Sequence, residues 1–382
     1  MNIVRTIGML RSLMCNNMQY REYGKTGKKV SVLGFGAMRL PCSGSLDKSV
    51  AILRHAFDLG INYVDTASMY SRQKNENLVG EAIKGRRDKI FIATKNHYKG
   101  KSGDEWQEYL DKSLKRLDID YIDFYHLHAL RWDNYRKMLD PNGPIERFRK
   151  VKEDGTIQHA CFSSHDKPEN IAKLIDTGDF DGMLVQYNLL DRKNEELIAY
   201  AHKKGMGVEI MGPIAGGRLA FPSDKIQNMF KIGNSTPEVA LRFVLSNPNV
   251  SVALSGMTSI EIVDENIATV SRKQSLSTKE RVRVIGALEE IKRLSDLYCT
   301  ECSYCMPCPN NVDIPSNFKA MNIFKIWGLE KQAQKRYRQM GRNKKRRWAE
   351  ACLECGECEP KCPQNIPIRK RLKETKKILG TN

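Results

Sequence analysis

The sequence predicts two units: an α/β domain folded as a (β/α)8 TIM barrel, followed by a smaller, mostly α-helical C-terminal domain. Two observations support this prediction. Short apolar segments alternate with longer amphipathic segments through most of the chain, and eight of the eleven cysteines stand in two short runs, 299–308 and 352–362. A chain of 382 residues can bury a full-sized core and a second, smaller one. We expect a disordered extension over 1–17, the barrel over 18–297 and a cysteine-rich domain over 298–382.

The composition is that of an ordinary globular protein, with 41% hydrophobic and 28% charged residues. No apolar run approaches the roughly 18 residues that a membrane-spanning helix needs. The first 17 residues contain two arginines and broken apolar stretches, without the small-residue cleavage site of a signal peptide. We therefore expect a cytoplasmic protein with no membrane segment, in which clustered cysteines bind metal rather than form disulfides.

Eight apolar segments, many of them rich in β-branched or aromatic residues, predict the strands of the barrel: 30–36, 62–67, 89–95, 121–128, 157–163, 182–188, 207–213 and 251–256. Amphipathic segments between them predict helices, among them 47–60, 76–85, 103–117, 168–178 and 194–205. Strands and helices that alternate in this way close into a barrel of parallel strands. Functional side chains of such barrels lie at the C-terminal ends of the strands.

Reactive side chains do stand at those predicted strand ends. Asp65 ends the second strand with Tyr70 five residues later, Lys95 ends the third, and His126 and His128 end the fourth. Each has an ordinary structural explanation as well: an aspartate can cap a helix, a lysine can be a surface charge, and a histidine can be a hydrogen-bonded wall residue. Their convergence at neighbouring strand ends favours a shared site.

Several motifs together resemble the aldo-keto reductase family: GFGAMRLP after the first strand, NYVDTASMY, IATK, YIDFYHLH, and SGMTSIEIVDEN at the eighth strand. The resemblance covers residues 18–297. It implies an oxidoreductase that interconverts a carbonyl and an alcohol on a small molecule with NADPH or NADH. It also implies that the catalytic tetrad of the family falls on Asp65, Tyr70, Lys95 and His128.

Carbonyl reduction explains why these four residue types belong together. Hydride addition builds negative charge on oxygen, which then needs a proton, and a tyrosine with a pKa of about 10 is a poor acid at neutral pH. A nearby lysine ammonium lowers the pKa of such a phenol, and Asp65 would anchor the ammonium of Lys95. His128 would orient the carbonyl or share the proton. We expect His126 on the opposite face of the strand and assign it no role.

The resemblance also implies the contacts of the nicotinamide coenzyme, although Met211 stands where many members stack a tyrosine on the ring. Ile262 occupies the position of the basic residue that meets the 2′-phosphate, and no lysine or arginine occurs over 255–266. NADH is therefore expected to bind at least comparably to NADPH. The implied coenzyme contacts are Gly36, Ala37, Met38, Asp65, Ser163, Ser164, Gln186, Met211, Gly212, Pro213, Ile214, Gly216, Gly256, Met257, Glu265 and Asn266.

The cysteine runs have the spacing of iron–sulfur ligands. Each contains four cysteines and closes on Cys-Pro, and the second run has the bacterial dicluster ferredoxin spacing, in which the fourth thiolate binds the other cluster. Two 4Fe–4S clusters are predicted, one held by Cys299, Cys302, Cys305 and Cys362, the other by Cys352, Cys355, Cys358 and Cys308. The first run is one residue short before its last cysteine. The alternative is a pair of zinc knuckles.

The segment between the runs has helical patterns over 316–341, and the region 297–368 resembles the α-helical ferredoxin domains attached to many redox enzymes. Its electrical charge also indicates a partner. The net charge of the chain is +18, and residues 299–382 carry 18 Lys and Arg against 8 Asp and Glu. The basic run 335–347 is either a solvated helix face or a docking site for an acidic redox protein, with nucleic-acid binding the least favoured alternative.

Three functions remain open at this point. The first is an NAD(P)H-dependent oxidoreductase whose two 4Fe–4S clusters transfer electrons or sense redox state. The second is a nicotinamide-binding redox sensor or adaptor with structural clusters and little turnover. The third is electron transfer with the barrel serving only as a dock. The intact tetrad favours the enzyme.

Overall fold

The computed structural model describes residues 18–41, 46–189, 191–215, 219, 235–271, 276–291, 299, 301–325, 330–340 and 347–380. The chain divides into two compact units. The first comprises Met1–Tyr187, Arg192–Pro213 and Leu241–Ser277, and the second comprises Asn188–Asp191, Ile214–Ala240 and Thr278–Asn382. The predicted extension 1–17 and the predicted domain boundary near 297 lie outside the described residues, so both stay predictions. Among the described residues, no helix has both the length and the apolar character needed to cross a bilayer.

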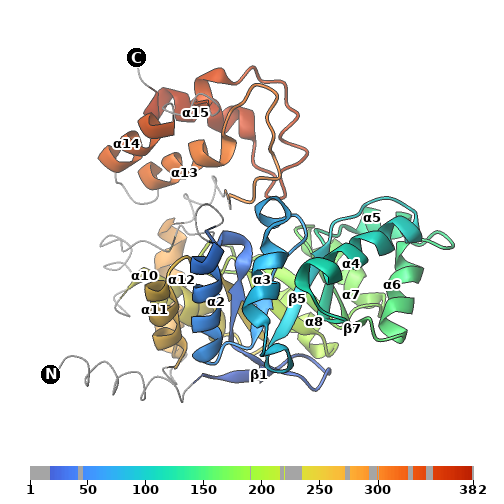
Figure 1. The fold of residues 1–382 in the computed structure, drawn as a ribbon. Helices are drawn as coiled ribbons and strands as arrows, with labels where there is room; N and C mark the ends of the chain where they lie inside the picture. Colours follow the sequence, from blue (N-terminus) through green and yellow to red (C-terminus); the bar gives the residue numbers. More distant parts are fainter. Residues whose placement is uncertain are drawn as a thin grey trace. The chain divides into compact units, whose positions relative to one another are not determined.

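The first unit contains a closed barrel of eight parallel strands in the order β10-β3-β4-β5-β6-β7-β8-β9, which confirms the predicted (β/α)8 fold (Figure 1). Every predicted strand segment contains or overlaps an observed strand. The strands are β3 (Leu33–Gly36), β4 (Tyr63–Asp65), β5 (Phe91–Asn96), β6 (Ile122–Leu127), β7 (Ile157–Ser163), β8 (Gly182–Gln186), β9 (Gly207–Met211) and β10 (Val252–Ser255).

The helices follow from the amphipathic segments of the sequence. In α4, for example, the Ser102 side chain caps the first turn by accepting from Glu105 N at 3.2 Å, and Trp106 lies on the buried face. The helix ends at Asp118, whose φ of 57° is left-handed. The helices described before the cysteine-rich domain are α2 (Leu46–Asp58), α3 (Asn75–Ile83), α4 (Gly103–Leu117), α5 (Trp132–Lys137), α6 (Pro144–Glu153), α7 (Pro168–Asp176), α8 (Glu195–Lys203), α10 (Thr236–Leu245), α11 (Ile260–Ser271) and α12 (Thr278–Ile291). Three short 3₁₀ turns lie between them: η1 (Ala37–Arg39), η2 (Tyr70–Gln73) and η3 (Arg87–Lys89).

One predicted strand is divided in the structure. The segment 30–36 was expected to be a single strand, but Lys29–Ser31 (β2) pairs antiparallel with Tyr20–Glu22 (β1), and the barrel strand β3 begins only at Leu33. The hairpin carries the fully buried Tyr23. A Cβ atom at Gly182 or Gly207, where β8 and β9 begin, would lie 2.1 Å from atoms of Tyr23. The two glycines therefore let this tyrosine close the N-terminal end of the barrel.

The cysteine-rich domain is mostly α-helical, as predicted. It contains α13 (Ile314–Lys325), α14 (Glu330–Met340) and α15 (Ile368–Leu379), with a 3₁₀ turn η6 (Ala349–Ala351), and Figure 1 shows the three helices gathered into one group. Phe318, Met321, Tyr337 and Leu372 form its apolar core together with three of the cysteines. The helical pattern expected over 316–341 corresponds to α13 and α14, with 326–329 and 341 outside the described residues.

Candidate functional site

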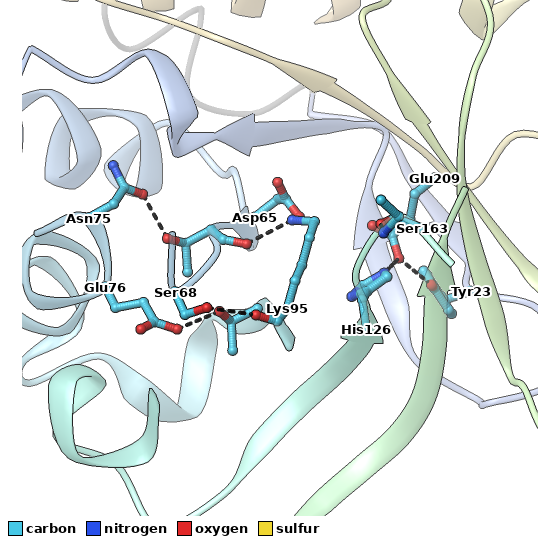
Figure 2. A network of polar contacts seen from close by, with 12 residues as sticks. Tyr23, Asp65, Ser68, Asn75, Glu76, Lys95, His126, Ser163 and Glu209 are labelled. Carbon is cyan, nitrogen blue, oxygen red and sulfur yellow. Dashed lines mark hydrogen bonds and ion pairs between the residues drawn. The ribbon is translucent and has the colours of Figure 1, made fainter. Parts of the chain in front are cut away.

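The four residues of the predicted tetrad lie together at the C-terminal end of the barrel. Lys95 Nζ donates to Asp65 Oδ1 and, at 2.7 Å, to the carbonyl oxygen of Thr66 (Figure 2). The same nitrogen lies 5.2 Å from the centroid of the Tyr70 ring. The Tyr70 ring meets the His128 imidazole edge-on, with centroids 6.1 Å apart and planes at 89°. The site thus combines an anchored cation, a phenol and an imidazole, and their catalytic roles stay predictions.

Burial and neighbouring charge set the protonation of this group. Lys95 and Asp65 are 1% and 4% exposed. Burial raises the pKa of Asp65, an effect that the Lys95 ammonium opposes. Burial lowers the pKa of His128 well below its usual value, and the charge of Lys95 lowers it further. His128 is therefore a neutral imidazole at neutral pH, suited to hydrogen bonding rather than to delivering a proton as a cation.

A second layer of polar contacts holds the strand ends. Thr66 Oγ1 donates to Asn75 Oδ1 at 2.7 Å, and Asn75 Nδ2 donates to the carbonyl oxygen of Ala37 at 2.9 Å. Ser68 Oγ donates to the carbonyl oxygen of Lys95 at 3.2 Å. These bonds tie the loops after β3 and β4 to the tetrad, and they fix one of the predicted coenzyme contacts, Ala37, beside it.

The expectation for His126 is wrong. Residues two apart in a strand share a face, so His126 points into the barrel as His128 does. Its Nε2 lies 2.7 Å from Glu209 Oε1, which also accepts from the Tyr23 hydroxyl at 2.5 Å (Figure 2). Both His126 and Glu209 are fully buried, and His126 is the register partner of Lys95. A polar network therefore fills the barrel interior next to Lys95.

The charge of this interior network is set by Glu209. Burial alone would raise the pKa of Glu209, but the His126 imidazole and the hydrogen bonds from His126 and Tyr23 lower it overall. Donor atoms of His126, Cys161 and Glu209 all lie within 4.8 Å of one another. The sequence signal was an acidic residue inside an apolar strand segment, GVEIM, which the sequence analysis did not use.

The predicted coenzyme contacts gather at the C-terminal ends of neighbouring strands, from β7 through β8, β9 and β10 to β3. The Ser163 hydroxyl accepts from Ala129 N at 2.8 Å. Ser164 Oγ donates to the carbonyl oxygen of Leu130 at 2.7 Å, so its proton is already engaged. Asn266 Nδ2 donates to Ser255 Oγ at 3.1 Å. Gly216 lies outside the described residues, and the set as a whole stays a prediction.

One cation near these contacts was missed by the sequence analysis. A Cβ atom at Gly256 would lie 2.9 Å from Arg39 Cγ, so Arg39 packs directly against this predicted adenosine contact. At the same end of the barrel, Asp264 Oδ1 lies 2.6 Å from His55 Nε2. The absence of basic residues over 255–266 thus gave an incomplete picture of the charge at this end.

In the cysteine-rich domain, three cysteines of the first run share a pocket with the last cysteine of the second run. Cys299, Cys302, Cys305 and Cys362 line it together with apolar side chains that include Ile314, Phe318 and Ile366. Burial, followed by the neighbouring Cys302 and Cys362, raises the pKa of Cys305 to about 12. Thiols in such surroundings become thiolates only when a metal compensates their charge.

The remaining cysteines form the complementary set. Burial, Glu359, Cys308 and Cys352 raise the pKa of Cys358 to about 11, so Cys308 lies near the second run although it follows Cys305 in sequence. The structure thus brings the first predicted set together and places Cys308 and Cys352 near Cys358, while the assignment of Cys355 stays a prediction. The second set is more open to solvent, since Cys355 is exposed while Cys299, Cys305 and Cys362 of the first set are buried.

The two runs adopt the same backbone turns despite the one-residue difference. Left-handed residues stand two and four positions after the first cysteine of each run, namely Glu301, Ser303, Glu354 and Gly356. Asn311 and Asn365, three positions after the last cysteine, are also left-handed. Six positions after that cysteine a 12-residue helix begins, α13 in one half and α15 in the other. The two halves therefore share these turn positions and helix starts, although among the described residues only the first half contains a cis peptide, Met306–Pro307.

Comparison with known proteins agrees with these observations. Residues 32–287 match the family model described as "Aldo/keto reductase family", and residues 298–366 match that of the "4Fe-4S dicluster domain". An uncharacterised oxidoreductase of Bacillus subtilis, YqkF, is 30% identical over 70% of this chain and 95% of its own length. The L-galactose dehydrogenase of Arabidopsis thaliana is 29% identical over 73% of this chain and 97% of its own.

A solved structure shows the same fold. The holo form of an aldo-keto reductase from Bacillus halodurans superposes with a TM-score of 0.62 at 30% identity, covering 71% of this chain and 96% of that one. The similarity therefore extends over the barrel, and the second family match accounts for the cysteine-rich domain. The chain belongs to the aldo/keto reductase family and carries a 4Fe-4S dicluster domain after its barrel.

Proposed function

We propose that this oxidoreductase interconverts a carbonyl and an alcohol with NADPH or NADH, with Tyr70 as the general acid. The observation that carries the proposal is the buried ammonium of Lys95, held by Asp65 and Thr66 with the Tyr70 ring 5.2 Å away. Burying a charge costs free energy unless the charge is paired, and this pair lies at the end of the barrel where such enzymes react substrates. The alternative of a binding protein without turnover gives the Lys95 ammonium no task beside a phenol.

The side chains divide the work as follows. A bound nicotinamide would supply the hydride for the carbonyl carbon. Tyr70 gives its proton to the carbonyl oxygen, and the ammonium of Lys95 stabilises the negative charge left on the phenol. Asp65 holds the ammonium in place. The neutral His128 donates a hydrogen bond that orients the carbonyl, and its lowered pKa supports this role over sharing the proton.

The crossed cysteine sets would hold two 4Fe–4S clusters, and such clusters supply single electrons. Cys299, Cys302, Cys305 and Cys362 would bind one, and Cys308, Cys352, Cys355 and Cys358 the other. The apolar wall around the first set, the raised pKa of Cys305 and the dicluster spacing of the second run support this assignment. An acidic redox protein would dock on the basic surface of this domain. Electron transfer or redox sensing by the clusters, like a cytoplasmic location, is part of the proposal.

The experiment is a pair of tyrosine substitutions in anaerobically purified protein. Tyr70→Phe should lose carbonyl reduction by at least about 100-fold, the typical contribution of a general acid, while nicotinamide binding followed by fluorescence is retained. Tyr200→Phe is the control. Tyr200 lies on α8, its hydroxyl donates to Asp176 at 2.5 Å, and its loss should change neither carbonyl reduction nor nicotinamide binding. Wild-type turnover by the Tyr70 variant would end the proposal, as would an absence of turnover in the unmodified protein with every carbonyl and alcohol tested.

A further inference from the structure

Cations gather on one side of the barrel mouth. Lys99 follows β5, Arg131 follows β6, and Lys193 follows β8. In the circular strand order, β5 and β6 lie opposite β9 and β10, whose ends carry half of the predicted coenzyme contacts. The positive side chains after β5 and β6 therefore face the part of the mouth that the coenzyme leaves to a substrate.

Lys99 is fixed next to the tetrad. Although the residue as a whole is exposed, its amine turns inward and donates to the carbonyl oxygen of His128 and, at 3.5 Å, to that of Ala129. Ala129 has a left-handed φ of 51°, and Ser163 holds it by accepting from its N–H at 2.8 Å. The structure thus maintains a strained turn directly after His128, and the Lys99 ammonium binds the carbonyl oxygens of that turn.

Arg131 is the free cation of the group. It is exposed, and within the described parts of the chain its guanidinium makes no hydrogen bond or ion pair. Burial and the charge of Arg131 lower the pKa of Lys99 to about 8. Burial, Lys193 and Arg131 lower the pKa of His165 to about 4. The positive charges of Lys99 and Arg131 therefore repel each other.

The carboxylate of Asp166 offsets only part of this positive charge. Arg131 helps to lower the pKa of Asp166, but the carboxylate accepts its hydrogen bonds from Trp132 N at 3.1 Å, Lys167 N at 2.9 Å and Asn170 Nδ2 at 3.1 Å rather than from the guanidinium. An anion bound between Lys99 and Arg131 would relieve the repulsion and take the unused donors of the guanidinium.

We propose that the substrate of this barrel carries an anionic group, a carboxylate or a phosphate, which binds Arg131 and Lys99 while its carbonyl faces Tyr70 and His128. The inference rests on the proposed carbonyl chemistry and deepens it. The anionic group makes and breaks no bond: the carbonyl carbon gains the hydride, its oxygen gains the Tyr70 proton, and the nicotinamide is oxidised. Arg131 and Lys99 serve as specificity residues.

The test compares three aldehydes of one shape on the full-length, cluster-loaded protein. They are 4-carboxybenzaldehyde, its uncharged methyl ester, and 4-formylphenyl phosphate. We expect kcat/KM for at least one anion to exceed that for the ester by about tenfold or more, as a charge-assisted contact allows. A higher value for the phosphate than for the carboxylate identifies phosphate as the preferred group, and the reverse order identifies carboxylate.

Matched variants locate the preference. Arg131→Gln and Lys99→Gln should raise KM for the anionic aldehyde severalfold more than KM for the ester, with kcat much less affected, and Arg131→Glu should favour the ester. Lys101→Gln is the control, because Lys101 stands in the same loop, is exposed and pairs with Asp140 at 2.7 Å. Equal kcat/KM for ester and anions in the unmodified protein overturns the inference and leaves the proposed function intact. If the protein reduces none of these three aldehydes and no other carbonyl compound, both the inference and the proposed function are overturned.

Discussion

In the barrel, the residues of the predicted tetrad are held by protein contacts alone, whereas the thiols of the cysteine-rich domain need a bound metal to compensate their charge. Lys95 already holds Asp65 and Thr66, and Glu209 already accepts from His126 and Tyr23. The thiols around Cys305 and Cys358 instead have raised pKa values and line apolar or solvent-open surroundings. The difference shows that one chain uses two ways to order a site, preorganisation by hydrogen bonds and preorganisation by a cofactor.

The two cluster sites differ from each other as well. Their runs share several left-handed positions, but Cys355 and the neighbouring Leu353, which is 75% exposed, leave the second site open, while three of four cysteines in the first are buried. Solvent stabilises the added negative charge of a reduced cluster, so exposure raises reduction potential. The second cluster should therefore accept electrons first and lose iron first.

Removal of metal should have the largest effect, because it should act on the cysteine-rich domain and not on the barrel. Anaerobic treatment with an iron chelator should unfold the cysteine-rich domain, because its core contains Cys299, Cys305 and Cys362, while the barrel keeps its fold. Limited proteolysis followed by mass spectrometry should show cleavage within 299–380 and a protected barrel. Equal protection of both parts after complete iron loss would show that the domain folds without clusters.

Single cysteine substitutions should separate the two clusters next. The intact protein should hold about eight irons. Cys308→Ala should damage the cluster of the second run, and Cys362→Ala that of the first, because each thiol lies with the opposite run. Electron paramagnetic resonance distinguishes the two signals. Cys161→Ala, in the buried part of β7, is the control and should keep all iron. Zinc in place of iron, or loss of the cluster of the same run, would contradict the assignment.

The stability of the barrel should depend on pH through two of its histidines. Every histidine of the chain precedes the cysteine-rich domain, and burial lowers the pKa values of His128 and His165, the latter to about 4. In the unfolded chain both histidines bind a proton near pH 6.5, whereas in the folded barrel they stay neutral at that pH. Stability of the barrel should therefore fall as pH drops below about 6.5, by about 1.4 kcal/mol per pH unit for each histidine.

Thermal unfolding between pH 7 and 5 measures this effect. The variants His128→Gln and His165→Gln should each flatten the dependence. His202→Gln should not, because His202 is exposed on α8. A slope that both substitutions leave unchanged would assign the acid sensitivity to other groups.

The smallest expected effect concerns coenzyme choice. Ile262→Arg should shift preference toward NADPH by on the order of 1–3 kcal/mol, since it adds a charge-assisted contact for the 2′-phosphate. Dissociation constants for NADH and NADPH give the measurement. Strong NADPH preference in the unmodified protein would indicate that another cation, such as Arg39 beside Gly256, already meets that phosphate. Arg39→Gln would then weaken NADPH binding more than NADH binding.

The alternation of apolar and amphipathic segments was sufficient to predict the barrel, because each strand is buried and each helix has one apolar face. It did not show the break at Val32, since the segment VSVLGFG is uniformly apolar while its two halves pair with different strands. The tetrad could be predicted because strand ends converge in a barrel. Arg39 could not, because its proximity to Gly256 arises where β10 pairs with β3 and the barrel closes.

In the cysteine-rich domain, spacing alone predicted the crossed sets but left the short first run in doubt. The conformation shows features that the two halves share, namely left-handed residues at matching positions and two 12-residue helices, and the ligand assignment of the first run stays a prediction. Such backbone signs cannot be read from side-chain types, since Glu301, Ser303 and Glu354 are not residues that ordinarily adopt a left-handed φ.

The crossing of the two runs has a consequence for how the protein is made. On the proposed ligand sets, Cys299, Cys302 and Cys305 leave the ribosome more than fifty residues before Cys362, and Cys308 more than forty before Cys352. Neither cube can be completed on a nascent chain until the second run has emerged, whereas all eight barrel strands are already out. Cluster delivery is therefore a late step, carried out on a chain whose barrel has had time to fold, and the waiting thiols depend on a reducing environment in the meantime.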